Sequence, residues 1–271
     1  MINMIWTKNF ILCYLVFFFC IFCCAQEWVL VWQDEFETDG LPDPKKWAYD
    51  VGGHGWGNQE LQYYIKERKE NARVENGKLI IEARLESYED KSYTSARLVT
   101  KGLGDWTYGR FEIRAKVPKG TGTWPAIWML PTVWDLGNGS WPDNGEIDIM
   151  EHVGFNPGKI HASTHCQKYV HLNNTQKTAI IEVADAQDAF HDYILEWNEK
   201  EIKVFVDDRH YFTSLNENKG WEYWPFFKDF HLILNIAVGG SWGGMKGVDT
   251  SIFPQKMEIE YVRVYKRQES Q

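Results

Sequence analysis

The sequence has very little cysteine outside its first 25 residues. Cys13, Cys20, Cys23 and Cys24 all precede residue 26, and Cys166 is the only cysteine that follows it. One cysteine forms no internal disulfide and cannot build a zinc site. The remaining part of the chain must therefore be held by a hydrophobic core, which a domain of roughly 245 residues can supply.

Several motifs with well-understood chemistry are also missing from the chain. It contains no H-E-x-x-H, no G-x-S-x-G, no G-x-x-x-x-G-K-[ST] and no G-x-G-x-x-G after a strand. These absences argue against zincins, serine hydrolases of the nucleophile-elbow type, P-loop proteins and dinucleotide-binding enzymes. His161 and His165 are four residues apart, but on an expected strand, and indicate no metal site. We expect no cofactor for catalysis.

Positive charge is in deficit, with 29 lysines and arginines against 38 acidic residues and a net charge of −9. This balance argues against nucleic acid and against an anionic membrane as partners. The substrate is expected to be neutral, or cationic at most. We expect a monomer.

The only long apolar run lies near the N-terminus, at residues 10–22. It is too short for an ordinary membrane span, so residues 1–25 are predicted to be a secretory signal peptide cleaved near Ala25. Alternatively, Cys24 carries a lipid, because Ile21-Phe22-Cys23-Cys24 resembles a lipobox. The protein is expected to be secreted, or to be an outer-surface lipoprotein of a bacterium. Such a lipid anchor is the only membrane attachment that we expect.

Long amphipathic helices are absent, and strand patterns fill the rest of the chain. In residues 111–117 apolar and charged side chains alternate, which is typical of a half-buried strand. Similar runs occur at residues 78–84, 193–197, 201–206, 231–238 and 256–265. Short helices are expected only near residues 62–70 and 184–191. The pattern predicts an all-β fold of two antiparallel sheets packed face to face, in one domain at residues 26–271.

The segment G-E-I-D-I-M-E at residues 145–151 places three carboxylates among apolar residues without any neighbouring cation. In a strand Glu146 and Asp148 share one face, whereas Glu151 has the opposite parity. A β-bulge near Met150 would absorb one residue and turn Glu151 to the same face. We therefore predict a bulge at this position.

Two carboxylic acids on either side of a bond are the groups required for glycoside hydrolysis, as nucleophile and as proton donor. A third acid can raise the pKa of its neighbours by its charge. The alternative is a solvated acidic strand face, and the spacing alone does not separate the two interpretations.

Tryptophans close to this segment suggest a carbohydrate. Trp124 and Trp128 share one face of an extended segment, and sugar rings stack on such aromatic surfaces. The alternative is that both belong to the core. Trp242 lies between two pairs of glycines, so it has little local bulk around it and is assigned to the cleft.

Several segments resemble those of glycoside hydrolase family 16, and specifically its laminarinase-like endo-β-1,3-glucanases. In the family's order they are W-G-N-Q-E-L-Q-Y-Y at residues 56–64, Y-T-S-A-R-L at 93–98, Y-G-R-F-E-I-R-A-K-V-P at 108–118, G-T-W-P-A-I-W-M-L-P at 122–131, W-P-D-N-G-E-I-D-I-M-E-H-V-G at 141–154, L-N-I-A-V-G-G-S-W-G-G at 234–244 and M-E-I-E-Y-V-R-V-Y at 257–265.

The resemblance implies a β-jelly-roll sandwich with a concave substrate cleft, and hydrolysis with retention of configuration. It makes Glu146 the nucleophile, Glu151 the general acid/base and Asp148 the residue that tunes the nucleophile. The additional Met150 matches the laminarinase-like branch, whereas the lichenase branch has one residue fewer between its acids.

The resemblance also implies substrate-binding residues. Trp124 and Trp128 would occupy subsites on the non-reducing side of the cleaved bond. Asn58 and Arg97 match positions that bind glucose hydroxyls, with a turn residue and a surface ion pair as the alternatives. Glu60 can instead orient Asn58. His165 resembles a histidine near the acid/base on the leaving-group side, whereas His152 is expected to be structural.

A structural Ca²⁺ on the convex side is often found in this family. The matching acid here is Glu260, where relatives usually have aspartate, with backbone carbonyls from about Glu35 and Gly77. The longer side chain of Glu260 departs from the family's pattern at this site.

The resulting hypothesis is a retaining endo-hydrolase of β-1,3-glucan, with this polysaccharide as partner. Alternatives are hydrolysis of mixed-linkage β-1,3-1,4-glucan or another β-linked polysaccharide such as agarose or carrageenan, and a non-catalytic glucan-binding module. The absence of a strongly basic cleft weakens the case for sulfated galactans. A module of that kind typically lacks the catalytic glutamates, which are both present here.

Overall fold

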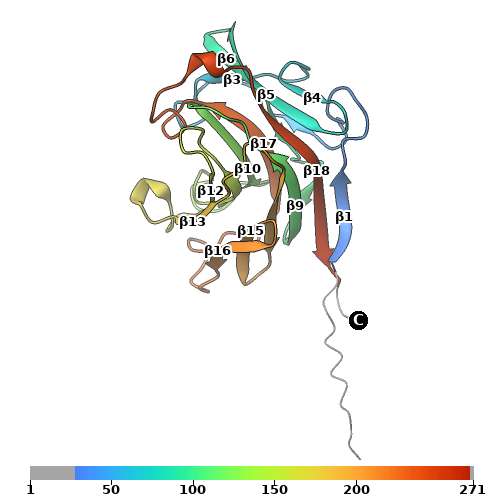
Figure 1. The fold of residues 1–271 in the computed structure, drawn as a ribbon. Coiled ribbons are helices and arrows are strands. Elements are labelled where there is room, and N and C mark those ends of the chain that lie inside the picture. Colours follow the sequence, from blue (N-terminus) through green and yellow to red (C-terminus); the bar gives the residue numbers. More distant parts are fainter. Residues whose placement is uncertain (1–27, 269–271) are drawn as a thin grey trace, which may run out of the picture.

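The computed structural model describes residues 28–268 as a sandwich of two β-sheets (Figure 1). The predicted signal peptide and Cys24 lie outside these residues. Among the residues described, no helix is long and apolar enough to cross a membrane. The two sheets confirm the predicted all-β jelly-roll sandwich.

The larger sheet forms the outer layer, in the order β16-β15-β14-β9-β18-β5-β6-β3, with β1 beside β18 and β4 beside β5. Its ten strands are β1 (Trp28–Asp34), β3 (Gln62–Tyr64), β4 (Ala72–Val74), β5 (Leu79–Tyr88), β6 (Lys91–Ser95), β9 (Gly109–Lys116), β14 (His191–Trp197), β15 (Glu201–Val206), β16 (Arg209–Leu215) and β18 (Gln255–Arg267).

The smaller sheet has the order β13-β12-β11-β10-β17-β7-β2, with β8 beside β17. Its eight strands are β2 (Ala48–Tyr49), β7 (Arg97–Val99), β8 (Asp105–Trp106), β10 (Thr123–Pro131), β11 (Glu146–Glu151), β12 (Lys159–His165), β13 (Lys177–Glu182) and β17 (Phe230–Val238). Its central strands carry the candidate site.

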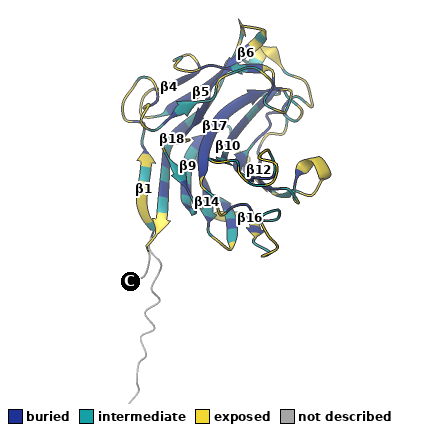
Figure 2. Cartoon of the chain, turned by 180° about the vertical axis from the view of Figure 1, so that it is seen from behind, coloured by how far each residue is buried: buried dark blue, intermediate teal, exposed yellow. Residues whose placement is uncertain are grey.

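The core lies between the two sheets, and strand parity decides which side chains enter it. Along β9 burial alternates residue by residue, and Phe111, Ile113 and Ala115 are all fully buried. This confirms the alternation predicted for residues 111–117. In contrast, all nine residues of β17 are buried, as the dark blue colour of this strand shows (Figure 2).

Two local predictions are wrong. Residues 62–70 and 184–191 form no α-helix: the first segment begins with strand β3 and continues in turns, and the second consists mainly of turns. Within residues 28–268 the helices are two short 3₁₀ turns, η1 (His171–Asn173) and η2 (Thr250–Ile252). The sheets are also not wholly antiparallel, because β3 pairs with β6 in parallel. The predicted helical patterns are each under ten residues, a length at which tertiary packing overrides helix propensity.

Candidate active site

A β-bulge in β11 determines where its three acids point. Ala126 and Ile127 of β10 pair with Glu151 and Met150, but the next residue, Trp128, pairs with Asp148. Ile149 is therefore the extra residue, and the pairing of β11 with β12 is irregular over the same span. This confirms the predicted bulge.

The bulge sends two consecutive apolar side chains to the core and leaves the acids on the opposite face. Ile149 and Met150 are both fully buried in the core cluster. Glu146, Asp148 and Glu151, called the acid trio below, line a cleft of about 480 Å³ on the other face of the sheet. Regular alternation would have placed Glu151 in the core, where an unpaired charge is costly.

Each outer acid of the trio accepts a hydrogen bond from a tryptophan. Trp141 Nε1 donates to Glu146 Oε2 over 2.9 Å, and Trp124 Nε1 donates to Glu151 Oε1 over 3.0 Å. These bonds fix the orientation of both carboxyl groups without adding a positive charge. Within residues 28–268, no lysine or arginine forms an ion pair with the acid trio.

Burial raises the pKa of all three acids, to about 8 for each. The charge of Asp148 is the second cause for both Glu146 and Glu151, since like charges in a dry site disfavour ionisation. The acid trio therefore holds at least one proton near neutral pH. A proton donor and an ionised carboxylate can then coexist in the same cleft.

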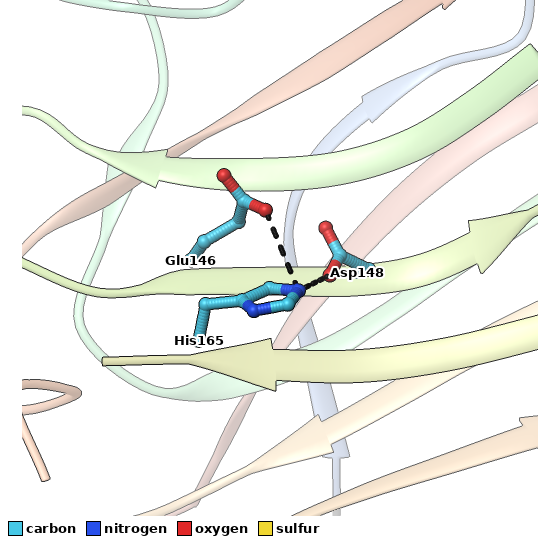
Figure 3. Close-up of side chains that lie close together, drawn as sticks. All are labelled: Glu146, Asp148 and His165. Atoms are coloured by element: carbon cyan, nitrogen blue, oxygen red, sulfur yellow. Dashed lines mark ion pairs between the residues drawn. The ribbon is translucent and has the colours of Figure 1, made fainter. Parts of the chain in front are cut away.

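His165 lies beside the other two acids rather than beside Glu151. Its Nε2 is 3.3 Å from Asp148 Oδ2 and 3.8 Å from Glu146 Oε1 (Figure 3). Across the strand pair His165 faces Glu146, whereas Glu151 faces His161. The antiparallel register of β12 explains this difference from the expected position near the acid/base.

Both predicted tryptophans of β10 lie on the cleft face. Trp128 donates from Nε1 to Asn235 Oδ1 over 2.7 Å. Trp124 meets Trp242 edge to face, with ring centroids 5.5 Å apart. All three tryptophans are only partly buried and line the cleft, so flat aromatic surfaces are available to a sugar.

Arg97 lies in the cleft and not on an open surface. Its guanidinium carbon is 4.6 Å from the ring centroid of Trp56 and 4.7 Å from that of Trp128. Its Nε is 2.9 Å from Asp50 Oδ2, so it also forms the ion pair that was the alternative interpretation. The stacking holds the planar donor group at the edge of the cleft.

A polar network orients Asn58. Its amide donates to Glu60 Oε1 over 3.3 Å, as expected if Glu60 positions it. The other oxygen of Glu60 accepts from Gln62 Nε2 over 2.6 Å, and burial raises the pKa of this carboxyl. Both Asn58 and Glu60 line the cleft. His152 is fully buried beside the Lys159 carbonyl, which agrees with a structural role.

Sequence reasoning missed other residues of the cleft wall. His161 meets Trp242 at 85°, with ring centroids 4.9 Å apart, and burial lowers its pKa to about 4. The sequence signal for His161 was its spacing of four residues from His165, which places both side chains on one face of a strand. Asn235 accepts from Trp128, and the signal for it was an amide in a strand whose only other polar residue is His231.

The carboxylate expected to bind Ca²⁺ already has a cationic partner in this structure. The Glu260 carboxylate accepts from Arg114 Nε over 2.9 Å, and Glu35 accepts two bonds from Arg263 at 2.7 and 2.8 Å. A guanidinium group thus already neutralises Glu260, the only carboxylate among the three expected ligands, whereas Glu35 was expected to contribute its backbone carbonyl. Gly77 forms part of the turn between β4 and β5.

Comparison with known proteins agrees with this geometry. The sequence model described as "Glycosyl hydrolases family 16" matches residues 59–263. The chain is 60% identical over 247 residues to a beta-glucanase of Rhodothermus marinus, covering 89% of this chain and 86% of that protein. It is 38% identical over 261 residues to a glucan endo-1,3-beta-glucosidase of Cryptopygus antarcticus, covering 90% and 94%.

Solved structures show the same fold. The laminarinase from Rhodothermus marinus superposes with a TM-score of 0.89 at 59% identity, covering 90% of this chain and 100% of that one. SCLam, described as a non-specific endo-beta-1,3(4)-glucanase, gives a TM-score of 0.83 at 47% identity, covering 89% and 92%.

Proposed function

Because the chain belongs to glycosyl hydrolase family 16, we propose that it cleaves β-1,3-linked glucan internally and with retention of configuration. The observation that carries this proposal is the bulge in β11, which brings the acid trio together in a cleft lined by tryptophans. Hydrolases of this family need no cofactor for catalysis.

In the first step, the Glu146 carboxylate attacks the anomeric carbon while Glu151 gives its proton to the departing glycosidic oxygen. The carbon–oxygen bond breaks and a glycosyl ester on Glu146 forms. In the second step, Glu151 takes a proton from water, the water oxygen bonds to the anomeric carbon, and the ester breaks. Two inversions give net retention.

The electrostatics of the site suit these roles. Burial and Asp148 keep Glu151 protonated near neutral pH. The bond from Trp141 favours ionised Glu146, but burial raises its pKa to about 8 as well, so the assignment of Glu146 as nucleophile rests on the match to the family's motif. Asp148 lies between the two glutamates in the sequence, and its charge raises the pKa of both.

Product stereochemistry tests the mechanism. A Glu151→Ala enzyme with azide should yield a β-glycosyl azide, because azide needs no general base and attacks the glycosyl ester. Glu146→Ala with azide should instead yield an α-glycosyl azide in one inversion. A β-azide from the Glu146 variant would overturn Glu146 as nucleophile.

The substrate is tested by a product profile on laminarin, lichenan, curdlan and agarose. Internal cleavage of laminarin and curdlan should give short oligosaccharides before glucose accumulates. Mixed-linkage glucan is the second candidate, because SCLam is described as acting on β-1,3(4)-glucan. Laminarin that is bound without new reducing ends would favour a non-catalytic glucan-binding module.

Export is proposed from the apolar run at residues 10–22. N-terminal sequencing of the mature protein should find a start near residue 26. A start at Cys24 with a blocked, lipid-bearing terminus would instead make it a surface lipoprotein. Recovery of the intact chain from the cytoplasm would contradict both forms.

A further inference from the structure

Three side chains of different chemistry converge at one point of the cleft. Glu146, Asp148 and His165 each offer one donor atom, and these three atoms all lie within 4.8 Å of one another. Figure 3 shows Glu146 and Asp148 extending from one strand toward the ring of His165 on the next. The cluster combines two carboxylates with an imidazole, and these are donor types that bind transition-metal ions.

One of the converging atoms, the Asp148 Oδ2, lacks a hydrogen-bond partner. Asp148 is 2% exposed and its Oδ2 has no hydrogen-bond partner, although His165 Nε2 is only 3.3 Å away. Glu146 uses Oε2 to accept from Trp141, which leaves Oε1 facing His165. Buried polar atoms in native proteins are normally satisfied, so the unpaired oxygen of Asp148 indicates a missing ligand.

The spacing of these donors fits a small dication. Zinc binds histidine nitrogen and carboxylate oxygen at about 2.0–2.2 Å, which places tetrahedral donors about 3.3–3.6 Å apart. The distances from His165 Nε2 are 3.3 Å to Asp148 and 3.8 Å to Glu146. Calcium prefers about six to eight oxygens at longer range and disfavours this nitrogen-containing set.

We propose that Zn²⁺ binds reversibly to Glu146, Asp148 and His165, with its fourth position open to the cleft, and thereby inhibits the enzyme. The ion occupies the carboxylate that must attack the sugar, so metal and glucan exclude each other. Glu151 is not part of this set, because it lies opposite His161 and not opposite His165. The competition with glucan rests on the proposed function, whereas the metal binding does not.

Direct binding is the first test. Equilibrium dialysis of the full chain without an affinity tag, with Zn²⁺ alone and metal quantification, should give one tightly bound equivalent. His165→Gln and Glu146→Gln should each weaken zinc binding more than about 10-fold. Removal of a residue that only hydrogen-bonds to a metal ligand already lowers metal affinity by about that factor. The matched control is His210→Gln, which removes an exposed histidine of β16 and should leave zinc binding unchanged.

The second test is competition. A β-1,3-gluco-oligosaccharide should lower the apparent zinc affinity, and Zn²⁺ should raise the KM for laminarin. Circular dichroism shows whether each variant is folded. If His165→Gln does not fold, the zinc affinity of the isosteric Glu146→Gln variant is the deciding measurement. Zinc affinity unchanged in folded Glu146→Gln or His165→Gln would overturn the proposal. Zinc bound by Glu146, Asp148 and His165 in a protein that never cleaves laminarin would support the metal site and contradict the proposed function.

Discussion

The outer face of the larger sheet and the cleft face of the smaller sheet both carry acidic residues, but the partners of these acids differ. On the outer face Arg114 donates to Glu260 and Arg263 donates to Glu35. Arg110 likewise pairs with Glu112 and Glu196. Each of these acids has a guanidinium partner and remains partly open to water.

Within residues 28–268 the acid trio has no guanidinium partner, and its central member, Asp148, is almost completely buried. Two of its members instead accept hydrogen bonds from neutral indole N–H groups. Burial raises the pKa of these acids although the indole bonds act in the opposite direction, whereas a nearby cation favours an ionised acid. An acidic strand therefore indicates chemistry only when its charges are buried and uncompensated.

Neutralising one acid on each face should give the largest contrast. Glu146→Gln and Glu151→Gln are each expected to lower kcat on laminarin by about 10²–10⁴-fold, because the nucleophile or proton donor is lost. Glu196→Gln on the outer face should change kcat less than about twofold. Steady-state kinetics and thermal unfolding of all three variants check this. An equal loss of kcat in Glu196→Gln and in the two cleft variants would contradict the proposed difference between the two faces.

The second contrast concerns stacking in the cleft. Trp128→Ala should raise KM for laminarin about 2–10-fold with a small change in kcat, because one sugar-stacking surface is lost. Trp128→Phe keeps an aromatic face but loses the bond to Asn235, so its KM should lie between that of the unmodified enzyme and that of Trp128→Ala. A kcat loss with unchanged KM would indicate that Trp128 acts on the acids and not on the sugar.

The third contrast concerns the indole donors. Removing the Trp124 N–H in Trp124→Phe should raise the pKa of Glu151, because that bond favours the ionised carboxylate. A proton donor with a higher pKa stays protonated to higher pH, so the alkaline limb of kcat should move up by less than about one unit. The pH profile of kcat measures this, and a downward shift would contradict the assignment.

The sequence predicted the features that follow from parity and residue chemistry. Alternation located the strands, and the wrong parity of Glu151 required the bulge that the structure has at Ile149. The same reasoning placed Trp124 and Trp128 together. These predictions depend on local periodicity, which a single sequence contains.

Other features depend on which segments meet, and local sequence does not specify this. The parallel pairing of β3 with β6 and the stacking of Arg97 between Trp56 and Trp128 join residues far apart in the chain. His165 was expected near the acid/base, but the register of β12 sets it opposite Glu146. Register is fixed by the whole sheet and not by one strand.

The smallest effect is expected on the outer face. Glu260→Gln should change the free energy of unfolding by less than about 1 kcal/mol, because its partner Arg114 is partly exposed and also lies 3.4 Å from Asp192. High salt should reduce the difference further, since exposed ion pairs are screened. Denaturant unfolding measured with Ca²⁺ and with EDTA adds a second readout. Stabilisation by Ca²⁺ in the unmodified protein that disappears in Glu260→Gln would show that the carboxylate leaves Arg114 for a metal ion.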